Sequence, residues 1–201
     1  INDSVVCGYG YTNPYLSFLN KQNKNLQISE MQPEFLDGNV KEKYDFDHQI
    51  IHEYFLPLDP SSVDVVISTH LLEFVDKPQS SIEEIWRILK PNGLFLTIIP
   101  RRSGIWTRYD NNPFGFGRSY SIKQFKSLIQ DFLVLDYRKP FLHFPPWDHY
   151  LNYKSHRTIE KIGDFFFPYM GGLMICVCKK IVYAKSSKKQ KKIPIKSFVA
   201  T

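Results

Sequence analysis

The residues best suited to bind a ligand lie where short apolar runs end. Gly8-Tyr9-Gly10 follows the run Ser4–Cys7, and Glu30 lies 20 residues beyond Gly10 at the end of a second run. Glycines in such a turn let backbone amides approach the polar groups of a ligand. An acid about 20 residues past such a turn is typical of a site that holds ribose hydroxyls. The pair predicts a nucleoside-type cofactor, with a purely structural turn and a solvated glutamate as the alternatives.

A second candidate, His70, comes directly after the apolar run 62–68. An imidazole at a strand end could accept a proton or orient a substrate. The alternative is a structural hydrogen bond to the neighbouring loop.

The segment 101–120 is rich in glycine, arginine and aromatic residues without any period, which is typical of a functional loop or lid. Its arginines and aromatic residues could frame an anionic or planar substrate. The alternative is that the arginines are solvated and the tryptophan is a packing anchor. The residues concerned are Arg101, Arg102, Trp106, Arg108 and Tyr120. A later aromatic segment, 143–150, is expected to be a packed loop.

These residues require a scaffold of alternating strands and helices. Apolar periodicity predicts strands at 4–7, 26–30, 50–51, 62–68, 94–99, 132–137 and 171–182, and helices from Pro14, over 78–89 and over 121–129. Strand 62–68, helix 78–89 and strand 94–99 form a βαβ unit, whose crossover must be right-handed. Gly93, in the turn Lys90-Pro-Asn-Gly, is expected to adopt the left-handed or tight-turn conformation. The chain is therefore predicted to be an α/β protein.

Residues 56–100 resemble the middle of a class I S-adenosylmethionine-dependent methyltransferase of the small bacterial "methyltransferase type 11" kind. The matching positions are Leu56-Pro57, Val63-Asp64, His70, Leu72-Glu73, Leu89-Lys90-Pro91 and Gly93. The segment 100–121 also resembles a subgroup in which an arginine and tryptophan loop follows that strand. The resemblance extends from about Val5 to Tyr183.

The resemblance implies a Rossmann-like three-layer sandwich around a mostly parallel seven-stranded sheet with an antiparallel last strand. It also implies the cofactor S-adenosylmethionine. Gly8, Tyr9 and Gly10 would approach the amino acid part of the cofactor, and Glu30, followed by Met31, would take the ribose. Glu53 and Tyr54 would lie beside the adenine, and Thr69 and His70 would close the site. The acceptor would be an unidentified, small molecule.

Three departures from the family pattern stand out. Val6 replaces an acid that usually lies two residues before the first glycine, and His52 replaces an acid before Leu-Pro, with Glu53 as a substitute. The family's helix before the first strand is missing, so we expect the chain to be truncated at its amino end. These departures leave open a degenerate member that acts as a binding or partner subunit.

The net charge of +6 and the pI near 9.1 come from one end of the chain. Eight of the 26 basic residues lie from Lys179 onward, where there is no acid, so residues 1–178 carry 18 basic and 20 acidic residues. We therefore expect a methyltransferase-like domain over 1–184 and a disordered lysine-rich tail over 185–201. The tail could contact RNA, as in an RNA-modifying methyltransferase, or acidic lipid; a solvated tail is the alternative.

Composition excludes several classes of protein. A hydrophobic content of 43% and an aromatic content of 15% are incompatible with global disorder. No apolar run approaches the roughly 18 residues that span a bilayer. The three cysteines have no metal or redox spacing and are expected to be core thiols of a cytoplasmic protein. The sequence predicts no metal site and does not indicate an oligomeric state.

Overall fold

The computed structural model describes residues 3–36, 45–104, 117–143 and 171–180, together with residues 161, 163 and 182. The strands are β1 (Val5–Gly10), β2 (Gln27–Pro33), β3 (Asp47–Ile51), β4 (Val63–Thr69), β5 (Leu89–Pro100), β6 (Leu133–Phe141) and β7 (Leu173–Lys180). The helices are α1 (Asn13–Gln22), α2 (Pro78–Ile88) and α3 (Ile122–Ile129), with a short 3₁₀ helix at Glu34–Leu36.

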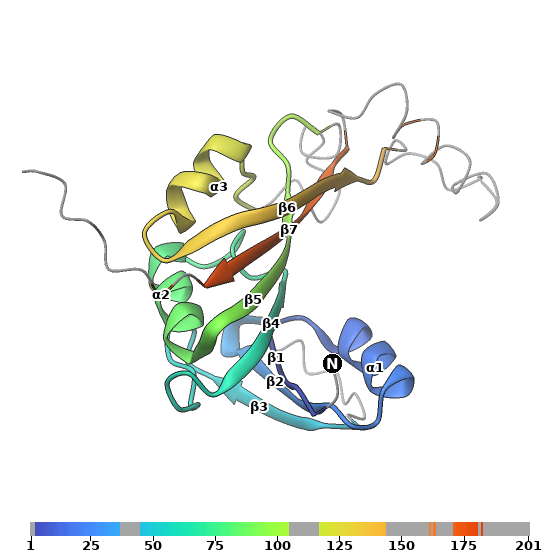
Figure 1. Ribbon diagram of the computed structural model, residues 1–201. Coiled ribbons are helices and arrows are strands. Elements are labelled where there is room, and N and C mark those ends of the chain that lie inside the picture. The colour runs from blue at the N-terminus through green and yellow to red at the C-terminus, as the bar shows by residue number, and fades with distance from the viewer. Residues whose placement is uncertain are drawn as a thin grey trace, which may run out of the picture.

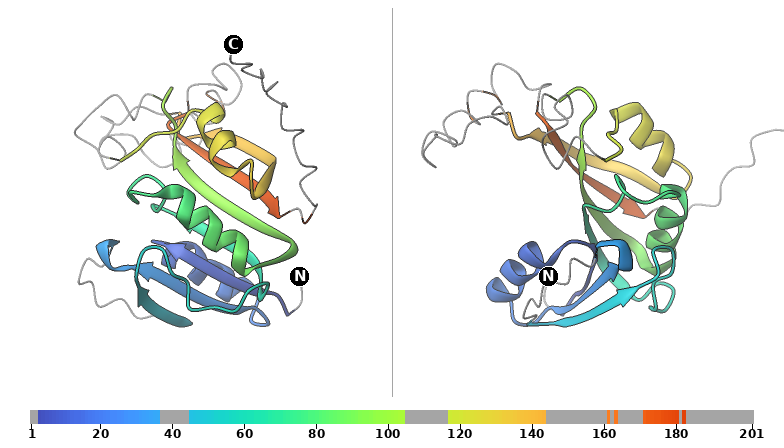
Figure 2. Two further views of the ribbon diagram at one scale, coloured as in Figure 1. Left: turned by 90° about the vertical axis from the view of Figure 1, so that its left-hand side faces the viewer. Right: turned by 180° about the vertical axis from the view of Figure 1, so that it is seen from behind.

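The strands form one sheet in the order β3-β2-β1-β4-β5-β7-β6 (Figure 1). Strand β7 pairs antiparallel with both β5 and β6, whereas the pairs among β1 to β5 are parallel. Helix α1 lies on one face of the sheet, and α2 and α3 lie on the other (Figures 1 and 2). The predicted Rossmann-like sandwich with a mostly parallel seven-stranded sheet is confirmed.

The alternation of side chains along β1 divides the core between the two faces. Val6 packs with Leu16 of α1, whereas Cys7 belongs to the larger cluster on the other face, which includes Ile82 and Ile85 of α2. Both faces of the central strands are therefore apolar, as is typical of parallel sheets.

Helix α2 has a polar anchor at its carboxyl end. Pro78 begins the helix, and Ile82, Ile85 and Ile88 are buried at helical spacing. Lys180 of β7 donates from Nζ to the carbonyls of Trp86 and Leu89, at 2.7 and 2.6 Å. The last carbonyls of a helix lack hydrogen-bond donors within the helix. The buried ammonium of Lys180 supplies these donors.

Two local predictions need correction. The first strand continues through Gly10, so the turn falls at Tyr11 and Thr12 instead of within Gly8-Tyr9-Gly10. Near the start of β5, Asn92 has the left-handed conformation, with φ 65°, and Gly93 does not. A Cβ at Gly93 would lie 2.9 Å from the carbonyl oxygen of Lys90, so this glycine is required for space.

Several predicted features lie outside the described residues: the tail 185–201, Trp106, Arg108 and most of the aromatic segment 143–150. Among the described helices, none is long and apolar enough to cross a membrane. The three cysteines are free thiols and all are buried.

Candidate functional site

The glycine turn and the end of β4 meet at the carboxyl edge of the sheet. Gly10 pairs with Thr69 and has φ +109°, which side-chain-bearing residues rarely adopt. A Cβ on Gly10 would lie 2.5 Å from the carbonyl oxygen of Thr69. The N–H of Tyr11 donates to that same carbonyl at 3.0 Å, and the Thr69 hydroxyl donates to the carbonyl of Tyr11. The chain after β1 is thus fixed against β4.

Glu30 lies on β2 beside this turn, with its side chain buried and only 1% of the residue exposed. Its Oε1 accepts hydrogen bonds from the backbone N–H and the hydroxyl of Thr12, each at 2.8 Å. Its Oε2 is buried and has no hydrogen-bond partner among the described residues. A buried carboxylate oxygen without a donor is costly, and a ligand hydroxyl would satisfy it. The site therefore fits a ribose, which carries such hydroxyls.

Glu53 and Tyr54 lie in the loop between β3 and β4, and both are half-buried. The Tyr9 hydroxyl donates to the carbonyl of Glu53, and the Tyr54 hydroxyl accepts from the N–H of Lys77 at 3.0 Å. The rings of His52 and Tyr54 meet edge to face, with centroids 6.0 Å apart. The loop thus has fixed anchors at the position expected for the adenine.

Tyr9 and Met31 were predicted to contact the cofactor, but their side chains lie in the core of the protein. Both side chains are buried on the α2 face, at 0% and 1% exposure. Burial raises the pKa of the Tyr9 hydroxyl far above its usual value. Burial likewise raises the pKa of the Cys7 thiol to about 12, so this cysteine is not a nucleophile at neutral pH.

His70 follows β4 in a left-handed conformation, with φ 53°, and a third of its side chain is exposed. Its Nδ1 lies 3.1 Å from Oε1 of Glu73, whose side chain is only 2% exposed. The other oxygen of Glu73, Oε2, is buried without a hydrogen-bond partner in the described part of the chain. A carboxylate on one ring nitrogen orients the imidazole and stabilises its protonated form.

The described loop residues that were predicted to frame a substrate differ in exposure. Arg101 and Tyr120 form a backbone bridge beyond the end of β5, and Arg102 is exposed. Tyr120 is only 5% exposed, and its hydroxyl donates to the carbonyl of Leu72 at 2.7 Å. Tyr120 therefore supports the segment that carries His70 and Glu73.

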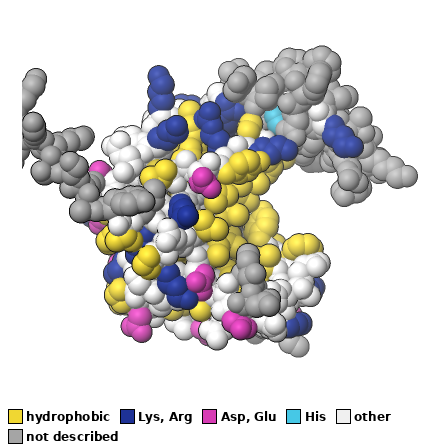
Figure 3. Space-filling view, in the orientation of Figure 1, with side chains coloured by type: hydrophobic (Ala, Val, Ile, Leu, Met, Phe, Trp, Pro, Cys, Tyr) yellow, Lys and Arg dark blue, Asp and Glu magenta, His cyan; other side chains and the backbone are white. Residues whose placement is uncertain are grey.

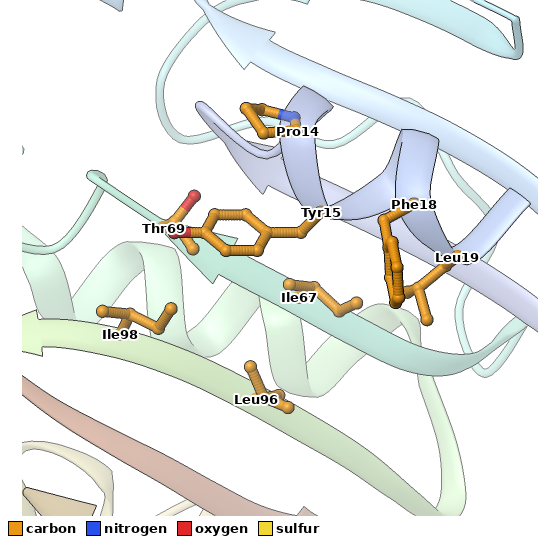
Figure 4. Close-up of a pocket in the computed structure, with 8 residues that line it drawn as sticks. All are labelled: Pro14, Tyr15, Phe18, Leu19, Ile67, Thr69, Leu96 and Ile98. Atoms are coloured by element: carbon orange, nitrogen blue, oxygen red, sulfur yellow. The ribbon is translucent and has the colours of Figure 1, made fainter. Parts of the chain in front are cut away.

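An apolar groove of about 460 Å³ lies beside the site, between α1 and the sheet (Figures 3 and 4). Tyr15 reaches from α1 toward Thr69, and Ile67, Leu96 and Ile98 form the floor (Figure 4). Such a lining offers little to the polar groups of a nucleoside. The polar edge around Gly10, Glu30 and Glu53 is therefore the candidate cofactor site. In the described residues, no group of three or more His, Cys, Asp or Glu could hold a metal ion.

Two residues of this site are absent from the sequence-based prediction. Thr12 precedes Asn13-Pro14 at the start of a helix, a position typical of a capping residue, but its hydroxyl donates to Glu30 instead. Glu73 lies three residues after His70, and this spacing is the signal that could have linked the two side chains.

Comparisons with known proteins agree with this geometry. Residues 4–97 match the family model described as a methyltransferase domain. No curated protein matches the sequence.

Solved structures extend the likeness over most of the chain. An S-adenosylmethionine-dependent methyltransferase from Thermotoga maritima is 17% identical with a TM-score of 0.63, covering 90% of this chain and 84% of that one. A chain in the complex of the Haloferax volcanii Trm112 methyltransferase activator with a methyltransferase is 18% identical, also with a TM-score of 0.63, covering 91% and 84%. Geranyl diphosphate C-methyltransferase from Streptomyces coelicolor, solved with S-adenosyl-L-homocysteine, is 14% identical with a TM-score of 0.60, covering 90% and 74%. At these identities the structures establish the fold.

Proposed function

We propose that this chain, of which residues 4–97 match a methyltransferase-domain model and which shares its fold with S-adenosylmethionine-dependent methyltransferases, transfers the methyl group of S-adenosylmethionine to a small-molecule acceptor. The observation that carries the proposal is Oε2 of Glu30, a buried acceptor without a partner among the described residues, beside the Gly10 turn. A ribose hydroxyl supplies the missing donor. The acceptor atom is set by the variable loops rather than by the fold.

Bound S-adenosylmethionine supplies a methyl group on a sulfonium, ready for displacement. The chain's own residues would bind the cofactor and orient its methyl group. Glu30 would accept from the ribose, Glu53 and Tyr54 would lie beside the adenine, and the turn at Gly10 would approach the amino acid part. Holding the reacting atoms in line supplies most of the rate in such a displacement.

His70 would receive the proton that an oxygen or nitrogen acceptor loses. Glu73, whose Oε1 lies 3.1 Å from Nδ1, would hold the ring in place and stabilise the imidazolium that results. The sulfonium would supply the methyl group, and His70 would take up the proton displaced from the acceptor. Arg102, exposed after β5, is a candidate to meet an anionic group of the acceptor.

The cysteines support a reducing compartment such as the cytoplasm for this reaction. All three are free and buried, so none takes part in a disulfide.

Calorimetry with S-adenosylhomocysteine tests the cofactor site. We expect binding by the wild-type chain and at least a tenfold loss of affinity in Glu30→Gln, because a hydrogen bond to a charged group is worth about 1.5–3 kcal/mol. Glu34→Gln, a change at an exposed glutamate close in sequence, should bind like the wild type. Absence of binding by the wild type at millimolar ligand would refute the proposal.

Transfer of a tritium-labelled methyl group identifies the acceptor class. The chain is incubated with labelled S-adenosylmethionine and separate small-molecule, RNA and protein fractions of a cell extract. Label in the small-molecule fraction is expected. Label in RNA would replace the small-molecule acceptor with the RNA-modifying alternative, and binding without any transfer would favour the degenerate member of the fold.

A further inference from the structure

We propose that Tyr9 is a positioning residue that joins the two ends of the cofactor site, an inference that rests on the proposed function. Tyr9 lies in β1 two residues before the turn at Tyr11, and its ring is fully buried on the α2 face of the sheet. Its hydroxyl donates to the carbonyl of Glu53, 44 residues further along the chain. One side chain thus connects the turn expected at the amino acid part of the cofactor with the loop expected at its adenine.

The other hydrogen-bonding anchors of this loop, in the described part of the chain, come from α2 and the residue before it. The N–H of Leu56 donates to Glu84 at 3.1 Å, and Arg87 donates to the carbonyls of Leu56 and Leu58 at 2.8 Å each. The N–H of Lys77, just before α2, donates to the Tyr54 hydroxyl. These contacts fix the loop to the helix but not to β1.

Tyr9 alone among these anchors belongs to the strand that ends in the glycine turn. In the described part of the chain, it is this hydrogen bond from Tyr9 that joins Glu53 to β1. The phenol sits in a low-dielectric environment, where a hydrogen bond to a carbonyl is stronger than in water and an unpaired carbonyl is costly. Removal of the hydroxyl should therefore loosen Glu53 and Tyr54 while the α2 anchors stay in place.

Tyr9→Phe is the direct test because it keeps the buried ring and removes only the donor. The ligands are S-adenosylhomocysteine and 5′-methylthioadenosine, which retains the adenosine but lacks the amino acid. We expect the affinity for both ligands to fall by the same factor, about fivefold, which corresponds to one hydrogen bond of about 1 kcal/mol. An equal loss excludes an effect confined to the amino acid end of the ligand, and the control variant below separates it from general destabilisation of the fold.

Lys180→Met is the matched control. It also removes buried hydrogen bonds to backbone carbonyls, but at the carboxyl end of α2. Both variants should unfold at lower denaturant concentration than the wild type. The affinity of Lys180→Met for both ligands should be that of the wild type.

Hydrogen exchange tests the positioning role without any ligand. The N–H of Phe55 donates to the carbonyl of His52 at 3.1 Å and so reports on the loop. We expect this amide to exchange about fivefold faster in Tyr9→Phe and at the wild-type rate in Lys180→Met. Unchanged exchange at Phe55 in Tyr9→Phe would overturn the inference, as would unchanged affinity for both ligands or a loss confined to S-adenosylhomocysteine. If the wild type binds neither ligand, the proposed function fails, and exchange at Phe55 still decides whether Tyr9 holds the loop.

Discussion

Thr12 and Glu30 are joined by two hydrogen bonds to a single carboxylate oxygen, one from the backbone N–H and one from the hydroxyl of Thr12, both at 2.8 Å. This arrangement fixes the rotation of the carboxylate. It also leaves the second oxygen, Oε2, for a donor from outside the described residues. Thr12 thus orients the group that is expected to bind the ribose.

Thr12→Val should weaken the binding of S-adenosylhomocysteine about fivefold. The change keeps the shape of the side chain and removes one of the two donors that orient the carboxylate, so about 1 kcal/mol of the hydrogen bond between Glu30 and the ribose should be lost. Thr12→Ser keeps the hydroxyl and should bind within twofold of the wild type. Calorimetry measures both, and equal affinity of Thr12→Val and the wild type would show that Thr12 does not orient Glu30.

Gly10→Ala should lower the free energy of unfolding by about 1–3 kcal/mol, because the residue has φ +109° and the new Cβ would lie 2.5 Å from the carbonyl oxygen of Thr69. Asn92→Gly is the reverse substitution, because it places a glycine where a residue with a side chain already has a positive φ, 65°. It should be neutral or stabilising by up to about 1 kcal/mol. Urea denaturation distinguishes the two, and equal stability of Gly10→Ala and the wild type would contradict the described turn.

Glu73→Gln should slow methyl transfer to an oxygen or nitrogen acceptor by about 10² or more, since general-base catalysis contributes about 10²–10⁴. His70→Asn should be slowed to a similar extent. Combining the two changes should add little, because both residues act through one imidazole. Initial rates with the acceptor fraction that takes up label provide the measurement.

Glu83→Gln, a change at an exposed residue of α2, is the control for these two variants and should keep the wild-type rate. Full activity of Glu73→Gln would rule out its role in holding His70.

Asp64 should contribute to stability above about pH 4 and lose that contribution in acid. Its Oδ2 accepts from Lys90 Nζ at 2.7 Å and from the N–H of Val5 at 2.9 Å, and these partners lower the pKa of the carboxyl below its usual value of 3.8. A lowered pKa in the folded chain means that the ionised form stabilises the fold above pH 3.8. The contribution disappears as the pH falls through the lower, folded-state pKa.

Asp64→Asn should therefore lose less stability than the wild type between pH 6 and pH 3. The difference at neutral pH should stay within about 1 kcal/mol, because a third of the side chain is exposed. Asp76→Asn, at an exposed position, should follow the wild-type curve. Parallel curves for Asp64→Asn and the wild type would argue against the pair with Lys90.

The parts of the fold that the sequence predicts are those encoded by local patterns. The buried positions of α2 recur at helical spacing, and the β-branched run of β4 is apolar enough to mark a central parallel strand. The spacing between Gly10 and Glu30 is likewise a local signal, because a single strand–helix–strand connection, β1-α1-β2, separates the two residues.

The contacts that shape the site were not predictable, because they depend on how separate elements lie against each other. Thr12 meets Glu30 across 18 residues, and Tyr9 meets Glu53 across 44. Neither pairing leaves a periodic signal. Asn92 shows a different difficulty, since adjacent Asn and Gly both suit a turn: Asn92 takes the left-handed conformation, while Gly93 is required for space beside the carbonyl of Lys90.

The place of β7 has a consequence for synthesis of the chain on the ribosome. β7 is the last described strand in sequence, yet it lies between β5 and β6 and supplies the lysine that satisfies the end of α2. A nascent chain that stops before residue 173 has an unpaired hydrogen-bonding edge along β5. Such edges pair with strands of other chains. Premature termination or slow elongation past β6 would therefore produce a partly folded chain that is prone to aggregate.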